Sequence, residues 1–93
     1  MVEVLYFADF KSITNKEKEH FNLHEKKSLM DLVRQLTDKY PKLGQILLDP
    51  NHQEIKKTIS IAINHSIIDR HEIDTYKLEN EDKVAFLLPV SGG

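Results

Sequence analysis

A single long helical pattern lies among segments that alternate like β-strands. Between residues 29 and 40 the apolar side chains recur every three or four residues, so they share one stripe of a helix: Leu29, Leu32, Val33, Leu36 and Tyr40. Ser28 is a suitable N-cap, and Asp31 is the acidic partner of a capping box. Pro41 cannot continue a helix and restricts the residue before it. The pattern therefore predicts one amphipathic helix that starts at Ser28 and stops before Pro41.

Strand patterns lie on both sides of this helix. Residues 2–8 and 83–90 are rich in branched and aromatic side chains, and residues 58–64 place three isoleucines on one face. Residues 19–25 alternate more weakly, and the polar stretch 11–18 before them is typical of a solvated connection. We therefore predict that the first two strands form a hairpin and that the last strand is apolar on both faces.

The remaining signals are short. Residues 64–65 predict a turn into a short returning strand at 66–68. Residues 46–48 predict a single turn of helix ended at Pro50, with the rest of 42–57 as loop. Strands mixed with one main helix predict an α+β fold in which that helix packs across one face of the sheet. The 93 residues leave room for one such domain.

Composition and charge exclude several classes of function. Thirteen Lys and Arg against fifteen Asp and Glu leave a net charge of −2, without a basic cluster long enough to follow a nucleic acid backbone. The chain has no cysteine, which excludes disulfides, thiolate metal sites and a cysteine nucleophile. No stretch approaches a membrane span, and the N-terminus lacks the features of a signal peptide. We therefore expect a cytoplasmic protein that binds neither nucleic acid nor membrane.

Metal binding and intrinsic catalysis are not expected either. His20 and His24 are four residues apart, but they lie in a strand-like alternation without a carboxylate spaced as in a zinc signature. The polar run over residues 69–74 is typical of an exposed loop. The sequence has no nucleophile motif or phosphate-binding glycine loop. We predict no metal site, no bound cofactor and no catalytic side chain.

The first and last strands carry apolar residues on both of their faces. By alternation, one set of side chains faces away from the other, and only one set can pack under the helix. The inward set is Val4, Tyr6, Phe86 and Leu88, and the outward set is Leu5, Phe7, Leu87 and Pro89. A contiguous apolar patch on a small domain is usually a partner surface. The alternative is that residues 41–57 fold over this face.

The C-terminus is the second feature that suggests a function. The chain has three glycines, and two of them are the last residues, Gly92 and Gly93. Without side chains they can lie extended in a narrow channel, and they present a carboxylate at the tip of a thin arm. The alternative is an ordinary frayed terminus.

Together these segments resemble a known family. VLYFADF, SLMDLVRQL, ISIAINHSII and LENEDKVAFLLPVSGG are similar, in this order, to the MoaD-type small subunit of molybdopterin synthase, a sulfur carrier with the ubiquitin-like β-grasp fold. The sequence departs from the family before the last strand, where Asn80-Glu81-Asp82 replaces the usual Gly-Asp, and after it, where Leu88-Pro89 replaces a double proline. The resemblance implies a β-grasp domain over residues 1–90 and a flexible tail over 91–93.

The resemblance also implies a chemistry. The Gly93 carboxylate would be adenylated with ATP by a partner related to ubiquitin-activating enzymes, and then converted to a thiocarboxylate by a sulfur donor protein. Gly92 would allow the tail to enter the large subunit of a heterotetrameric synthase, where the sulfur builds the dithiolene of molybdopterin from cyclic pyranopterin monophosphate. Phe7 and Leu87 match the family's apolar contact with that subunit, and the predicted partner-binding set is completed by Leu5, Pro89 and Ser91.

Other functions share most of these features. A carrier for thiamine or tRNA thiolation, or a ubiquitin-like modifier, would have the same fold and the same diglycine. A plain β-grasp interaction module would use the sheet face alone, and its tail would be incidental. The helix and last-strand residues favour the molybdopterin carrier through resemblance.

Overall fold

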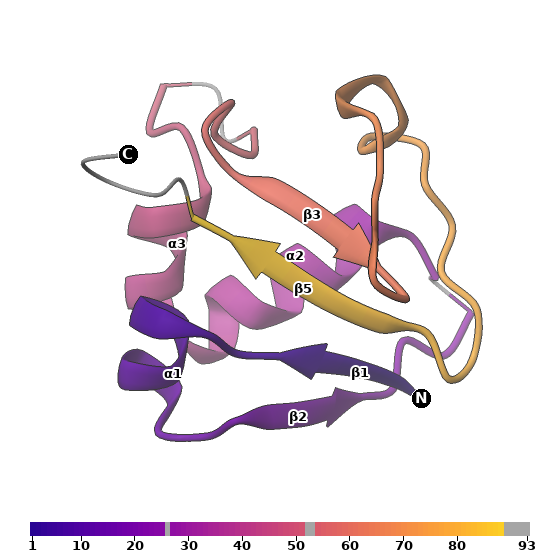
Figure 1. Cartoon of the computed structure of the whole chain (residues 1–93), viewed down its shortest axis with the longest axis horizontal. Coiled ribbons are helices and arrows are strands. Elements are labelled where there is room, and N and C mark those ends of the chain that lie inside the picture. Colours follow the sequence, from indigo (N-terminus) through magenta and orange to yellow (C-terminus); the bar gives the residue numbers. More distant parts are fainter. Residues whose placement is uncertain (26, 52–53, 89–93) are drawn as a thin grey trace.

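A mixed sheet with one helix across its inner face forms the centre of the computed structural model, which describes residues 1–25, 27–51 and 54–88 (Figure 1). The strands are β1 (Val2–Leu5), β2 (Lys18–Phe21), β3 (Ser60–Ile63), β4 (Ser66–Ile67) and β5 (Lys83–Leu87). The helices are α1 (Ala8–Thr14), α2 (Leu29–Lys39), α3 (Pro41–Leu47) and the short 3-10 helix η1 (Arg70–Glu72). The predicted α+β class is confirmed.

The strand order is β2-β1-β5-β3-β4, so the first and last strands of the chain lie side by side in the sheet. β1 and β5 are parallel, with Leu5 opposite Ala85, and the other neighbouring strands are antiparallel. β1 and β5 therefore run toward the same end of the sheet, where α1 and α3 lie (Figure 1).

The main helix forms as its sequence predicts. The Ser28 hydroxyl oxygen accepts a hydrogen bond from the Asp31 backbone N–H at 3.0 Å, which caps α2. In return, the Asp31 carboxylate accepts a hydrogen bond from the Ser28 hydroxyl at 2.7 Å. The apolar stripe of α2 is buried against the sheet, at Leu29, Leu32, Val33 and Leu36.

The predicted connection between the first two strands was wrong. β1 and β2 do pair as predicted, but residues 11–14 of the predicted solvated connection belong to the helix α1, which begins at Ala8. Only Phe10 and Thr14 of this helix are buried, which is too weak a stripe to recognise in the sequence. The helix owes its place to packing, since the Phe10 ring lies 6.0 Å from that of Phe86. β1 also ends at Leu5, earlier than residue 8.

The segment after α2 was also predicted incorrectly. Pro41 ends α2, but it is also the first residue of α3, where its missing N–H costs nothing. The predicted single turn at 46–48 is the end of a helix that begins five residues earlier. Leu43 and Leu47 are fully buried, and α3 packs against α2 and α1.

The remaining strands are shorter than their patterns indicate. β2 spans residues 18–21, so it starts one residue before the predicted 19–25 and ends four residues earlier, and β3 and β4 cover 60–63 and 66–67. The predicted turn between β3 and β4 is confirmed, with positive φ angles of 51° at Asn64 and 73° at His65. β5 ends at Leu87, and residues 89–90 of the predicted last strand lie outside the described residues.

Candidate functional site

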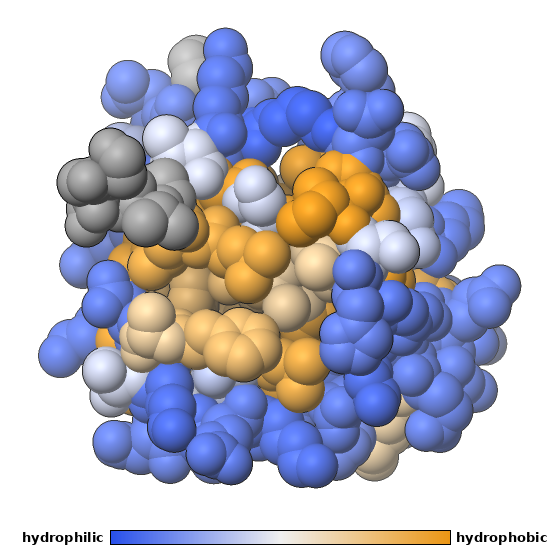
Figure 2. Space-filling model, viewed as in Figure 1, coloured by the Kyte–Doolittle hydropathy of each residue, from blue (hydrophilic) through white to orange (hydrophobic). Residues whose placement is uncertain are grey.

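The sheet face turned away from α2 is apolar along its middle (Figure 2). Register partners place four apolar residues in one row across four strands: Leu5, Ala85, Ala62 and Ile67. Leu87 lies in the next row, opposite Ser60. We use the name open face for the surface formed by Leu5, Phe7, Ala62, Ile67, Ala85 and Leu87.

The alternation of β1 and β5 was predicted correctly. Val4, Tyr6 and Phe86 point inward and are at most 2% exposed. On the open face Leu5 and Leu87 are half-buried, and Phe7 is 50% exposed. The alternative that residues 41–57 cover this face does not hold for α3, the helical part of that segment, which packs against α2 and α1 instead.

Ile67 is a candidate site residue that the sequence reasoning missed. Its side chain is 59% exposed, and antiparallel pairing with Ala62 brings it to the open face. A strand of two residues is too short to show an alternating pattern. Which face of the sheet each side chain occupies is therefore set by the register of that strand with its neighbour. The available signal was the turn at residues 64–65, which fixes that register in a hairpin.

Charged residues border the open face along β2. The Glu3 carboxylate lies 3.8 Å from the Lys18 ammonium and 3.2 Å from the His20 imidazole, on neighbouring strands. His24 lies in the turn beyond β2, with a φ of 54°. Among residues 1–25, 27–51 and 54–88, the structure has no group of three or more His, Asp or Glu side chains that could hold a metal ion. In the same ranges, every helix is too short or too polar to cross a membrane.

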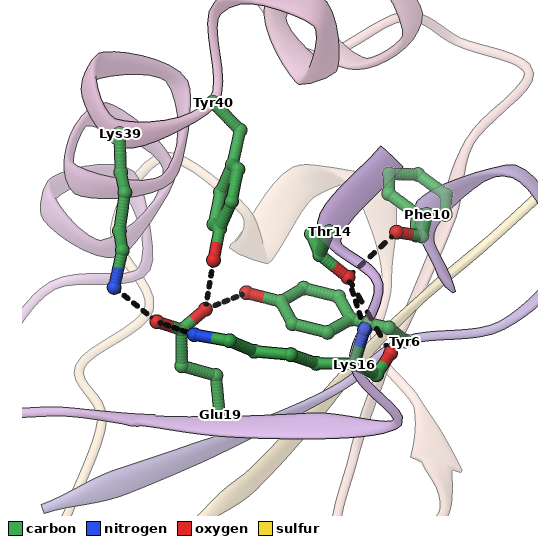
Figure 3. A network of polar contacts seen from close by, with 7 residues as sticks. All are labelled: Tyr6, Phe10, Thr14, Lys16, Glu19, Lys39 and Tyr40. Carbon is green, nitrogen blue, oxygen red and sulfur yellow. Dashed lines mark hydrogen bonds and ion pairs between the residues drawn. The ribbon is translucent and has the colours of Figure 1, made fainter. Parts of the chain in front are cut away.

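Behind the end of β1, one carboxylate joins four side chains (Figure 3). Glu19 Oε1 accepts hydrogen bonds from the hydroxyls of Tyr6 at 2.9 Å and Tyr40 at 2.8 Å. Its Oε2 accepts from the ammonium of Lys16 at 3.1 Å and from that of Lys39. We call these five residues the Glu19 network.

The Glu19 network keeps its carboxylate ionised. Burial alone would raise the pKa of Glu19, but hydrogen bonds from Lys39, Tyr40, Tyr6 and Lys16 outweigh it and lower that pKa from 4.5 to about 2. Burial and the hydrogen bond to Glu19 together raise the pKa of the Tyr6 hydroxyl. The phenol therefore stays protonated and remains a donor to the carboxylate.

The predicted reactive end of the chain lies outside the described residues, as do Pro89, Ser91, Gly92 and Gly93. The strand that leads to it is described. Because β5 is parallel to β1, Leu87 lies at the same end of the sheet as the last residues of β1. The end of β5 and Phe7, which follows β1, therefore lie at the same end of the sheet.

The fold and this arrangement match known proteins. The model described as the ThiS family matches residues 4–93. The chain belongs to the ThiS family. Among curated proteins, the molybdopterin synthase sulfur carrier subunit of Chlamydomonas reinhardtii is 27% identical over 92 residues, which cover 99% of this chain and 98% of that protein.

Solved structures of other proteins have a similar fold. The small archaeal modifier protein 1 of Methanosarcina acetivorans is 27% identical, with a TM-score of 0.84 over 99% of this chain and 95% of that chain. A second match is a chain in the solved complex of subunits 1 and 2 of the molybdopterin-converting factor from Helicobacter pylori. This chain is 25% identical to it, with a TM-score of 0.63 over 99% of this chain and 97% of that one. These matches confirm the ubiquitin-like β-grasp fold and the resemblance to the MoaD-type carriers.

Proposed function

We propose that this ThiS-family chain is the sulfur-carrying small subunit of a molybdopterin synthase. The observation that carries the proposal is the open face, which includes β5, the strand that leads into the diglycine tail. A partner docked on Phe7 and Leu87 would meet the tail as it leaves β5. The Chlamydomonas reinhardtii relative supports the molybdopterin branch.

The proposed chemistry takes place on the Gly93 carboxylate. A carboxylate is a poor electrophile, so a ubiquitin-activating-like adenylyltransferase first joins it to the α-phosphate of ATP and releases pyrophosphate. A sulfur donor protein then supplies sulfur at the oxidation level of sulfide, which displaces AMP and leaves a thiocarboxylate. The large subunit takes up the tail, the sulfur passes to cyclic pyranopterin monophosphate, and water hydrolyses the acyl group to restore the Gly93 carboxylate. In this scheme the carrier supplies no catalytic side chain and binds no cofactor of its own.

The solved complex supports the choice of partner. The Helicobacter pylori structure holds subunits 1 and 2 of the molybdopterin-converting factor together, which is the type of assembly proposed for this chain. An apolar patch of this kind on a small domain is usually covered by a partner. We expect a heterotetramer of two carriers and two large subunits. Because two sulfurs are needed per product, we also expect two carrier deliveries.

Intact mass spectrometry of the protein purified from its own cell tests the proposal. We expect the mass change of one oxygen-to-sulfur exchange, located at Gly93, and co-purification with a large synthase subunit. Gly92→Ala should abolish sulfur delivery because the added methyl group would obstruct the tail channel. Gly44→Ala, which adds the same group on α3, serves as the matched control. Full synthase activity of Gly92→Ala would contradict the proposal.

A second function is supported by one comparison. The small archaeal modifier protein of Methanosarcina acetivorans is as similar in sequence as the Chlamydomonas reinhardtii carrier. A modifier would use the same activated Gly93 but transfer the acyl group to a lysine of another protein. Isopeptide-linked conjugates, together with an absence of the thiocarboxylate, would favour the modifier function over sulfur delivery, whether the sulfur is used for molybdopterin, for thiamine or for tRNA thiolation.

A further inference from the structure

Beyond the end of β1 the backbone hydrogen bonds among the described residues are few. The ladder with β5 stops at Leu5; after it the Tyr6 N–H donates to the Glu17 carbonyl at 2.8 Å, and the Phe7 carbonyl accepts from the Phe10 N–H at 3.0 Å. Two residues after Tyr6, Ala8 has a φ of 50°, in the left-handed region that residues with a Cβ rarely adopt. Phe7 therefore lies between the end of a ladder and an unfavourable turn.

The side chain of Phe7 does not hold this segment in place either. It is 50% exposed on the open face, where a partner would cover it. Tyr6 points the opposite way and is 2% exposed. Because neighbouring residues of an extended chain face opposite sides, a fixed Tyr6 side chain fixes the direction of Phe7.

Two things hold the Tyr6 side chain: its burial in the core and its hydrogen bond to Glu19. The Glu19 carboxylate accepts the Tyr6 hydroxyl at 2.9 Å and the Tyr40 hydroxyl at 2.8 Å, and the two tyrosine rings meet edge to face with centroids 6.4 Å apart. Lys39 and Tyr40, at the end of α2, hold the same carboxylate. Figure 3 shows that Glu19 joins the end of β1 to the end of the main helix.

We propose that Glu19 is a positioning residue for partner docking, which acts by holding Tyr6 so that Phe7 stands at a fixed place on the open face. The identity of the partner rests on the proposed function above. Glu19 itself points into the network behind the sheet, away from the surface that the partner would touch. Its effect on docking therefore passes through Phe7.

A double-mutant cycle separates this role from general stabilisation. We expect Glu19→Gln to weaken binding to the large synthase subunit by about tenfold and Phe7→Ala to weaken it further. In the Phe7→Ala background, Glu19→Gln should cause no additional loss. Equal losses in both backgrounds, or no loss in the wild-type background, would overturn the proposal. Glu17→Gln is the matched control, because the Glu17 carboxylate is exposed and pairs only with Lys11 among the described residues.

Two further measurements keep the proposal testable. If Glu19→Gln does not fold, Tyr6→Phe removes the single hydroxyl that links β1 to Glu19 and takes its place in the cycle. NMR relaxation of the free carrier should show larger fast motions at Phe7 in the variant and unchanged motions at Ile67, whose strand is held by β3. Unchanged motion at Phe7 would overturn the positioning role. If the wild-type carrier fails to bind the large subunit, the proposed function fails, and the relaxation data still decide the role of Glu19.

Discussion

Asn64 and Lys83 hold each other by two reciprocal hydrogen bonds. The Asn64 backbone N–H donates to the Lys83 carbonyl at 2.8 Å, and the Lys83 backbone N–H donates to the Asn64 side-chain oxygen at 2.9 Å. The Asn64 side-chain amide also donates to the Asp82 carboxylate at 2.9 Å. These bonds tie the turn before β4 to the start of β5, and so connect the two strands that carry Ile67 and Leu87.

Asn64 is expected to be sensitive to substitution for two separable reasons. Its side chain makes two hydrogen bonds, and its φ of 51° is tolerated better by Asn than by most residues. We expect Asn64→Ala to lower the free energy of unfolding by about 2–3 kcal/mol. Asn64→Gly keeps the backbone conformation available and should recover about 1 kcal/mol of that loss. Urea unfolding measures both, and equal stabilities for the two variants would contradict the backbone part of the explanation.

The Glu19 network predicts a specific dependence of stability on pH. The pKa of Glu19 is lowered from 4.5 to about 2 by its four donors against the effect of burial, so the folded state favours the ionised carboxylate. This contribution, about 2–3 kcal/mol, is fully present above pH 4.5 and is lost as the pH falls to about 2. The difference in unfolding free energy between wild type and Glu19→Gln should therefore shrink over that range. A difference that stays constant from pH 7 to pH 2 would show that the charge is not the cause.

Gly44 offers a stabilising substitution. It lies inside α3, and a Cβ at this position would meet Thr37 Cβ and Cγ2 of α2 at 3.7 Å, which is ordinary van der Waals contact. Alanine is the better helix former, so Gly44→Ala should raise the free energy of unfolding by about 0.5–1 kcal/mol. Gln45→Ala, one residue along the same helix, should change stability little. A loss of stability in Gly44→Ala would mean that α2 and α3 are packed more tightly than these distances indicate.

Helix α2 could be predicted from the sequence because both of its ends are marked by neighbouring residues. Ser28 caps the start and Pro41 forces the end, and neither signal depends on the rest of the fold. Helix α1 could not be predicted, because its place depends on packing of Phe10 against Phe86, which is distant in the sequence. Local patterns carry no information about such a partner.

The same distinction applies to the candidate site. Alternation within single strands was enough to place Leu5, Phe7 and Leu87 on one face. To predict the place of Ile67, the register of β4 against β3 would have to be known. To predict the Glu19 network, one would have to know that donors from a strand end, a loop and a helix end meet at one carboxylate. The role of Gly92 and Gly93 stays a prediction, because they lie outside the described residues.

Ile67 provides the sharpest test of the extent of the open face. Its side chain is 59% exposed, so Ile67→Ser removes apolar surface that folding does not need, and we expect little change in the free energy of unfolding. If the partner covers the whole row from Leu5 to Ile67, binding to the large synthase subunit should weaken by about tenfold. Glu72→Ser, at an exposed position on η1, is the control and should bind normally. Isothermal titration calorimetry gives the dissociation constants. Normal binding by Ile67→Ser together with weak binding by Phe7→Ala would confine the docking surface to the end of the sheet where the tail begins.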